Sequence, residues 1–262
     1  MKINRAMSII CILGFCFKFV IAQDRPFLFT VVPSSDATTR QLSLQYDAVY
    51  GRETFEPIGG DNVEQKIGMQ TSLNESITLV GKIGFAMNNI STNSSQHIEL
   101  LTQLLKSQDS KIDLSIGSGF LHEYRGTNVL FGRVIVGRRF ESWQLFGNVL
   151  VEKPFSQTRD QLDLFLTTGL SYNYSPSIQL GIEAVGQDLE GFWDETEAEG
   201  GATMFIGPTM VAAIPATSWT FTLGVGPIIR ATQNIWTSIA PRYFNATKDN
   251  GYIIHGAINI VM

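Results

Sequence analysis

Apolar and polar positions alternate with a period of two over most of the chain. The clearest stretch is 162–174, where Leu, Thr and Tyr occupy every second position and mostly small or polar residues lie between them. Successive side chains of a β-strand point to opposite faces, so this period is typical of strands rather than helices. The pattern returns at 178–184, 219–226 and 252–262. The chain is therefore predicted to be all-β.

Twelve alternating segments are recognisable in the sequence, and each is close to or slightly above the 9–11 residues that a tilted strand needs to cross a bilayer. The predicted strands are 40–50, 62–72, 75–86, 96–107, 110–122, 127–139, 142–153, 161–174, 177–189, 200–213, 217–230 and 252–262. An amphipathic helix also fits 96–107, although a strand is favoured there. The predicted architecture is a closed, antiparallel, up-and-down transmembrane β-barrel of about twelve strands.

The predicted connections alternate between tight and longer ones. The tight connections are 73–74, 108–109, the neighbourhood of 141, 175–176 and 215–216. The longer ones are 51–61, 87–95, 123–126, 154–160, 190–199 and 231–251. Bacterial outer-membrane barrels have short periplasmic turns and longer outer loops. This order therefore predicts that both ends of the barrel chain face the periplasm.

Aromatic residues gather near both ends of the predicted strands, as expected for girdles at the two membrane interfaces. Those beside the tight turns are Phe140, Trp143, Tyr172, Tyr174 and Trp219. Those near the opposite rim are Tyr50, Phe120, Tyr124 and Tyr252.

The N-terminal region divides into two parts before the first predicted strand. Residues 1–22 have a basic start, an apolar run and a small-residue site before Gln23, which predicts a cleaved signal peptide. A membrane anchor is the alternative, but Lys18 makes the apolar run short for a span. Residues 23–39 include an apolar run between Pro26 and Pro33. Because an extra strand would break the even count, 23–39 is interpreted as a periplasmic extension and 40–262 as the barrel.

Composition excludes several classes of function. Loss of three basic residues with the leader takes the 19 basic residues to 16, against 24 acidic ones, and gives a net charge of about −8. Nucleic-acid binding needs a basic face, so none is expected. Both cysteines, Cys11 and Cys16, lie in the leader. The mature chain therefore has no disulfide and no cysteine-based metal site or nucleophile.

The chain from about residue 23 onwards resembles Gram-negative outer-membrane β-barrels nearly end to end. Within it, 180–186, 199–201 and 207–208 resemble small, largely uncharacterised porin-like barrel families, some associated with uptake of aromatic or other small compounds. The resemblance implies outer-membrane lipids, the outer-membrane assembly machinery and small solutes as partners. One departure is Met262, since such barrels usually end in Phe or Tyr.

The charged residues on the inward phase are the first candidates for function, because Arg or Lys facing lipid near the midplane costs about 2–4 kcal/mol. They are Glu64, Lys66, Lys82, Glu99, Asp113, Glu152, Asp163, Glu183, Arg230 and His255. Two interpretations stay open: a hydrated channel or binding site for small solutes, and a structural or interaction barrel with a filled interior. Inward glycines, such as Gly169 and Gly224, would leave room and favour the channel.

Two outer loops are further candidates. The acidic loop contains Asp188, Glu190, Asp194, Glu195, Glu197 and Glu199. Its carboxylates suit Ca²⁺ or the attraction of cationic solutes, but they follow no calcium-loop spacing, so a solvated loop is favoured and no metal is predicted. The last loop, 231–251, is rich in aromatic residues and either folds inward or lies on the rim.

A lipid-modifying enzyme is the less favoured alternative. Such an enzyme needs a nucleophile beside a base, and the histidines are His97, His122 and His255. No Gly-x-Ser-x-Gly motif is present and no Ser is placed beside a histidine by the sequence. No catalytic residue and no cofactor are therefore predicted. A soluble β-sandwich is the alternative fold.

Overall fold

The computed structural model describes residues 26–32, 42–52, 62–87, 92–106, 112–124, 126–156, 161–193, 201–232 and 250–262. These ranges contain twelve β-strands and a short 3-10 helix. The elements are β1 (Leu42–Arg52), β2 (Asn62–Ser72), β3 (Ile77–Met87), β4 (Thr92–Leu105), β5 (Asp113–His122), β6 (Asn128–Arg139), β7 (Trp143–Pro154), β8 (Asp163–Ser175), β9 (Ile178–Gln187), η1 (Leu189–Phe192), β10 (Thr203–Ala213), β11 (Trp219–Arg230) and β12 (Gly251–Val261). Within these ranges, no helix is long and apolar enough to cross a membrane.

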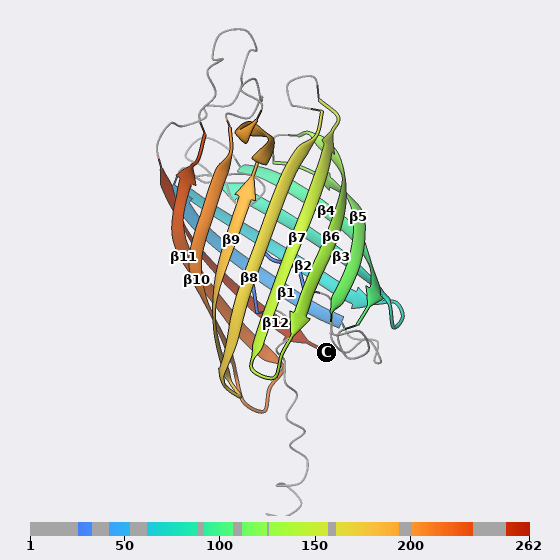
Figure 1. Ribbon diagram of the computed structural model, residues 1–262, viewed down its shortest axis with the longest axis vertical. Coiled ribbons are helices and arrows are strands. Elements are labelled where there is room, and N and C mark those ends of the chain that lie inside the picture. Colours follow the sequence, from blue (N-terminus) through green and yellow to red (C-terminus); the bar gives the residue numbers. More distant parts are fainter. Residues whose placement is uncertain are drawn as a thin grey trace, which may run out of the picture.

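The strands form one closed antiparallel barrel (Figure 1). Each strand pairs with its neighbours in sequence, and β1 closes the barrel against β12 in a continuous register from Ser43↔Val261 to Arg52↔Tyr252. Each of the twelve described strands has two hydrogen-bonding neighbours, so none of them presents an unpaired edge. The predicted fold class, an all-β closed antiparallel barrel, is confirmed.

Strand β4 settles the one ambiguous segment in favour of a strand. It pairs with β3 from Ile77↔Thr102 to Met87↔Thr92, and a bulge between Gln103 and Leu105 shifts its register against β5. The strand begins at Thr92, earlier than predicted, so the β3–β4 connection is only 88–91. The β3–β4 connection is therefore shorter than the predicted 87–95. The β4–β5 connection, 106–112, is longer than the tight turn predicted at 108–109, so the alternation of tight and longer connections is not strict.

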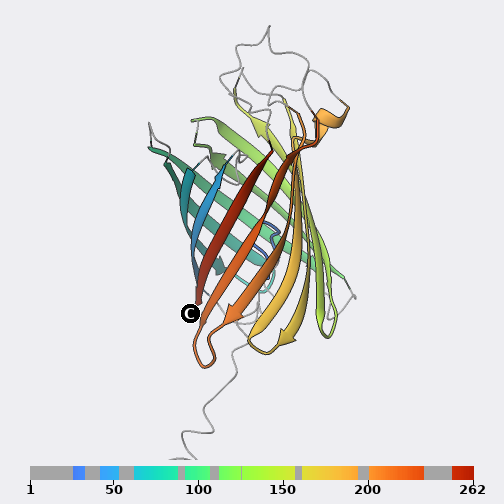
Figure 2. The same cartoon turned by 90° about the vertical axis from the view of Figure 1, so that its left-hand side faces the viewer.

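The two ends of the barrel nevertheless differ in their connections (Figure 2). The turn end carries the connections 140–142, 176–177 and 214–218 and the C-terminus, whereas the loop end carries 188–202 and 231–250. At the turn end the Trp143 and Tyr172 rings lie 4.6 Å apart, and at the loop end Tyr50 and Tyr252 lie 6.2 Å apart. Tyr124, expected on the rim, is instead buried and donates its hydroxyl hydrogen to Glu64.

The outward and inward faces of the barrel wall differ in chemistry. On β10, for example, Met204, Ile206 and Met210 are exposed, while Thr203 and Thr209 are buried. Exposed large apolar side chains occur on each of the twelve described strands, whereas the buried polar residues lie on the inward phase. Such an inversion of the usual soluble pattern is what a bilayer demands of a spanning barrel.

Residues 26–32 lie inside the barrel rather than outside it. Their backbone is hydrogen-bonded to Glu183 of β9 and Asn148 of β7, which both point inward. A periplasmic extension is therefore the wrong interpretation for these residues, which we call the inner segment. The physical reason is that the wall offers acceptors for the backbone N–H groups of the segment and apolar surfaces for its side chains. The rest of 23–39 and the leader 1–22 lie outside the described residues.

Candidate functional site

The charged residues expected on the inward phase all lie buried or half-buried in the barrel wall. The buried ones are Glu64, Glu99, Asp113, Glu152, Asp163, Glu183 and His255. The half-buried ones are Lys66, Lys82 and Arg230. The interactions of the inward polar residues form three groups. These are ion pairs within the wall, a polar network that reaches the inner segment, and the hydrogen bonds by which Glu183 anchors that segment.

The ion pairs link neighbouring strands or neighbouring inward positions. Lys66 Nζ lies 2.7 Å from Glu64 Oε1, and Arg139 Nη1 lies 2.7 Å from Asp113 Oδ2. Arg230 donates from Nη1 to Thr203 Oγ1 at 2.7 Å. Interactions of this kind compensate for the burial of a charge, which is costly when the charge is left alone.

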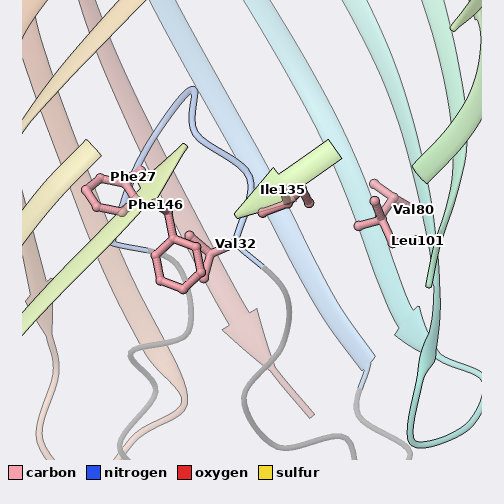
Figure 3. Close-up of a cluster of buried hydrophobic side chains, with 6 residues drawn as sticks. All are labelled: Phe27, Val32, Val80, Leu101, Ile135 and Phe146. Carbon is pink, nitrogen blue, oxygen red and sulfur yellow. The ribbon is translucent and has the colours of Figure 1, made fainter. Parts of the chain in front are cut away.

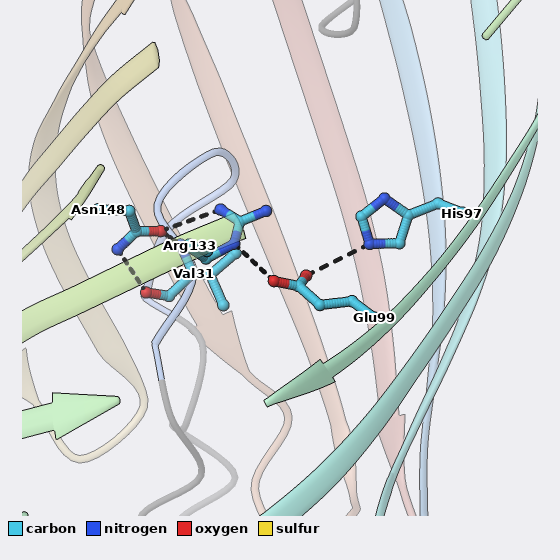
Figure 4. Close-up of polar contacts among 5 residues, drawn as sticks. All are labelled: Val31, His97, Glu99, Arg133 and Asn148. Carbon is cyan, nitrogen blue, oxygen red and sulfur yellow. Dashed lines mark hydrogen bonds and ion pairs between the residues drawn. The ribbon is translucent and has the colours of Figure 1, made fainter. Parts of the chain in front are cut away.

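The polar network runs along the inner wall from β4 to β7 and reaches the inner segment (Figure 4). His97 Nε2 lies 3.3 Å from Glu99 Oε2, and Arg133 donates from Nε to Glu99 Oε1 at 2.7 Å. Arg133 Nη1 also lies 3.4 Å from Asn148 Oδ1. Asn148 accepts from the Val31 N–H at 2.7 Å and donates from Nδ2 to the Val31 carbonyl at 2.9 Å. This network therefore joins β4, β6 and β7 to the inner segment.

Glu183 anchors the other side of the inner segment. Its carboxylate accepts three consecutive backbone N–H groups, from Leu28 at 2.9 Å, Phe29 at 2.9 Å and Thr30 at 2.7 Å. Hydrogen bonds to an ionised acceptor are stronger than neutral ones. Because Glu183 is fully buried, these bonds also supply the polar contacts that its carboxylate needs inside the barrel.

Inward glycines provide the space into which the segment packs. A Cβ at Gly169 would lie 2.5 Å from the Phe27 ring, and a Cβ at Gly224 would lie 2.6 Å from Leu28 Cδ1. At either distance a neighbouring atom would have to move, and the rigid Phe27 ring has less freedom to do so than the terminal methyl of Leu28. The sequence interpretation, that these glycines leave room in the lumen, is thus wrong in its detail: at these two positions the inner segment occupies the room.

The side chains of the inner segment join two apolar clusters on the inner wall. Phe27 and Val32 pack in the lower cluster, with Val80, Leu101, Ile135 and Phe146 (Figure 3). Phe29 packs against the upper cluster, which consists of Val49, Val185, Phe205, Ile228 and Ile253. The segment thus rises from the turn end, makes its tip near Phe29 and returns.

Two cavities lie on opposite sides of the inner segment. The larger has a volume of about 170 Å³ and reaches residues of the loop-end half such as Glu123, Glu152 and Phe165. The smaller has a volume of about 70 Å³ and reaches Gln70 and Asn259 in the turn-end half. The residues lining both are Leu28, Phe29, Val31, Lys82, His97 and Arg133. The two cavities therefore meet at these six shared residues, which we call the constriction.

Several residues of this site were missed at the sequence level. Asp47, Arg133, Arg139 and Asn148 were not identified as candidates. Arg133 lies on a strand whose inward positions include the buried, apolar Val129, Phe131 and Ile135, so neither face of β6 reads as polar. In the sequence, the inner segment is recognisable only as an apolar run between Pro26 and Pro33.

The three histidines occupy different settings. His97 belongs to the polar network, and His255 Nε2 lies 3.1 Å from Asp47 Oδ1 on the neighbouring strand. His122 lies at the loop end, where its Nδ1 is 2.8 Å from Asn128 Oδ1. Each of these partners is a carboxylate or an amide, which orients an imidazole, and none of the three is the serine hydroxyl that a serine–histidine nucleophile requires.

Only the start of the acidic loop lies within the described residues. Asp188 has a left-handed backbone with φ of 52°, and Glu190 in η1 accepts the Leu164 N–H at 2.9 Å, which ties η1 to β8. The other acidic-loop candidates, Asp194, Glu195, Glu197 and Glu199, and the aromatic part of 231–251 lie outside the described residues. Among the residues that are described, no group of three or more His, Cys, Asp or Glu is arranged to hold a metal ion.

Comparisons with known proteins identify the fold but no family. No family model matches the chain, and neither does any curated protein. Among solved structures, the chain is similar to the KdgM porin in complex with disordered oligogalacturonate, with a TM-score of 0.57 and 8% identity over 83% of this chain and 98% of that one. It is also similar to the COG4313 outer membrane channel from Pseudomonas putida F1, with a TM-score of 0.53 and 9% identity over 91% of this chain and 99% of that one. At these identities the likeness establishes the fold of an outer-membrane β-barrel.

Proposed function

We propose that this chain is an outer-membrane channel for small solutes, whose path runs through the barrel and is narrowed by the inner segment. The observation that carries the proposal is the pair of cavities that share one constriction. A path between them would pass Lys82, His97 and Arg133, which are polar groups suited to a hydrated solute. The exposed apolar side chains of the outer wall support placement in a lipid bilayer.

The proposal includes an orientation and a set of partners. The tight turns and the C-terminus would face the periplasm, and the longer connections the exterior, after cleavage of the leader 1–22. Outer-membrane lipids would contact the outward face, and the outer-membrane assembly machinery would insert the chain. A Gram-negative origin follows from the same reasoning, since this fold serves that membrane.

Ion conduction and its selectivity test the channel. The purified chain is reconstituted into planar bilayers, and the reversal potential is measured under a salt gradient. Lys82→Glu replaces a cation with an anion at the constriction and should shift selectivity towards cations, because fixed charge at a narrow point selects the counter-ion. Lys153→Glu is the matched control: Lys153 lies near the loop end of β7 on its outward phase and should leave selectivity unchanged.

The alternatives make different predictions in the same experiments. A structural barrel with a filled interior predicts no conductance from the wild type or from a variant with a loosened inner segment, and this result would reject the channel. A lipid-modifying enzyme predicts lipid turnover by the wild type that is lost in His255→Ala. The described contacts of His255, to Asp47 and to the Phe29 ring at 5.2 Å, give no observation that favours this enzyme.

A further inference from the structure

The hydrogen bonds described above between the barrel wall and the inner segment all involve the backbone of the segment. Glu183 accepts three consecutive N–H groups, and Asn148 pairs with both the N–H and the C=O of Val31. None of these five contacts depends on the identity of a side chain in the segment. A different peptide that adopted the same path would therefore make all of them.

Side-chain selection comes from the surfaces around this backbone contact. The Phe27 ring lies over Gly169 and Leu28 over Gly224. The Phe29 ring centroid lies 5.1 Å from that of Phe205 in an edge-to-face arrangement. These surfaces accept aromatic and branched apolar side chains. The wall thus binds the backbone of the segment with hydrogen bonds and its side chains with apolar surfaces, which we call the seats. Peptide-binding proteins commonly obtain affinity from main-chain hydrogen bonds and specificity from side-chain pockets.

The site borders both cavities. Leu28, Phe29 and Val31 line the loop-side cavity as well as the turn-side one. The inner segment is covalently joined to the barrel and so has a high effective concentration at the site. A peptide from solution would have to displace it, and weaker binding of the segment would favour the peptide.

We propose that Glu183, Asn148 and the seats beside Gly169 and Gly224 form a binding site for short apolar peptides, which the inner segment occupies as an internal ligand. The inference rests on the proposed function only in taking such peptides as the solute of the channel. It names the class of ligand by chemistry: consecutive backbone N–H donors, flanked by aromatic or leucine-like side chains.

A peptide-binding measurement on the full chain tests the site. The probe is the heptapeptide Pro-Phe-Leu-Phe-Thr-Val-Val, the sequence of residues 26–32, carrying a fluorophore for anisotropy in detergent. The double variant Phe27→Ala/Leu28→Ala weakens the internal ligand and should bind the probe at least tenfold more tightly than the wild type. Adding Glu183→Gln to this variant should weaken binding about 30- to 150-fold, because one hydrogen bond to the probe backbone is lost and the other two lose their charge assistance.

The matched control is a probe with the same side chains and methyl groups on the N atoms that correspond to Leu28 and Phe29. It lacks two of the three donors to Glu183 and should bind at least tenfold more weakly. Equal binding of the two probes would overturn the inference, as would no binding by a double variant whose heat-modifiable gel mobility shows a folded barrel.

Conductance of the same double variant separates this inference from the channel. Conduction that the unmethylated heptapeptide blocks supports both. Conduction without any effect or binding of the peptide leaves the channel standing and rejects the peptide site. Specific binding by a variant that does not conduct supports the site and rejects the channel.

Discussion

Glu183→Gln is the substitution that most directly tests how the inner segment is held. In the wild type, Oε1 accepts from Phe29 and Thr30 and Oε2 accepts from Leu28. The amide of Gln keeps one acceptor oxygen and presents an NH₂ group where the other oxygen was. The Leu28 N–H then loses its acceptor, and the remaining bonds lose their charge assistance.

The expected magnitude follows from these lost interactions. A hydrogen bond to a charged group contributes roughly 1.5–3 kcal/mol, so a loss of about 2–3 kcal/mol in the docking free energy of the segment is reasonable. Each 1.4 kcal/mol is a factor of ten, so the released population should rise by about 30- to 150-fold. The barrel should stay folded, because its strand pairing is closed without the segment.

Thiol labelling measures this release. Cys11 and Cys16 are the only cysteines of the chain, so a Thr30→Cys probe in a Cys11→Ser/Cys16→Ser background gives one reactive group in the segment. Thr30 is only 4% exposed, so its cysteine should react slowly with a hydrophilic methanethiosulfonate while the segment is docked. Adding Glu183→Gln should raise the rate by the factor given above.

A second buried carboxylate provides the control for Glu183→Gln. Glu64 is also fully buried and inward-facing, but it binds Lys66 and Tyr124 rather than the segment. Glu64→Gln should therefore leave the labelling rate unchanged. Equal labelling rates with and without Glu183→Gln would refute the idea that Glu183 anchors the segment.

Three further predictions concern the segment and the outer wall. Asn148→Leu removes two neutral hydrogen bonds to Val31 and should raise the same labelling rate about tenfold, a smaller effect than that of Glu183→Gln; no change would contradict the pairing. Gly169→Ala would place a Cβ 2.5 Å from the Phe27 ring and should raise the rate, whereas Gly81→Ala meets no atom within 4 Å and should not. Leu170→Arg puts a charge on the outward face of β8 and should lower the folding free energy in lipid vesicles by about 2–4 kcal/mol in urea titrations; an unchanged midpoint would contradict contact with lipid.

The fold was predictable because one physical demand acts on every strand. A wall between lipid and lumen needs apolar side chains at every second position, so segments such as 162–174 carry the information locally. The main errors in the strands lie at their ends. For β4, the polar residues Thr92 to Ser95 give no apolar alternation, yet they pair with β3 as far as Met87.

The inner segment was not predictable because its position depends on distant partners. Its run of consecutive apolar residues from Phe27 to Phe29 has no period that assigns a face. Its acceptors, Glu183 and Asn148, lie far along the chain on strands that are otherwise ordinary. The sequence placed Glu183 on the inward phase, but it did not indicate that backbone N–H groups would be its partners.

The inward glycines also could not be interpreted fully from the sequence. The sequence identifies where a side chain is missing, as at Gly169 and Gly224, but it does not identify what lies in the space. Whether an inward glycine widens a lumen or seats a ring depends on the segment opposite, which comes from another part of the chain.

The contacts of the inner segment also fix an order of assembly. Val31 meets Asn148 across 117 residues, and Leu28 meets Glu183 across 155 residues. Strands β7 and β9 must therefore be in place before residues 26–32 have anything to dock against. A segment that precedes β1 in the sequence therefore takes its final position only after the strands that hold it. Docking of the inner segment therefore requires that β7 and β9 have already taken their places in the wall.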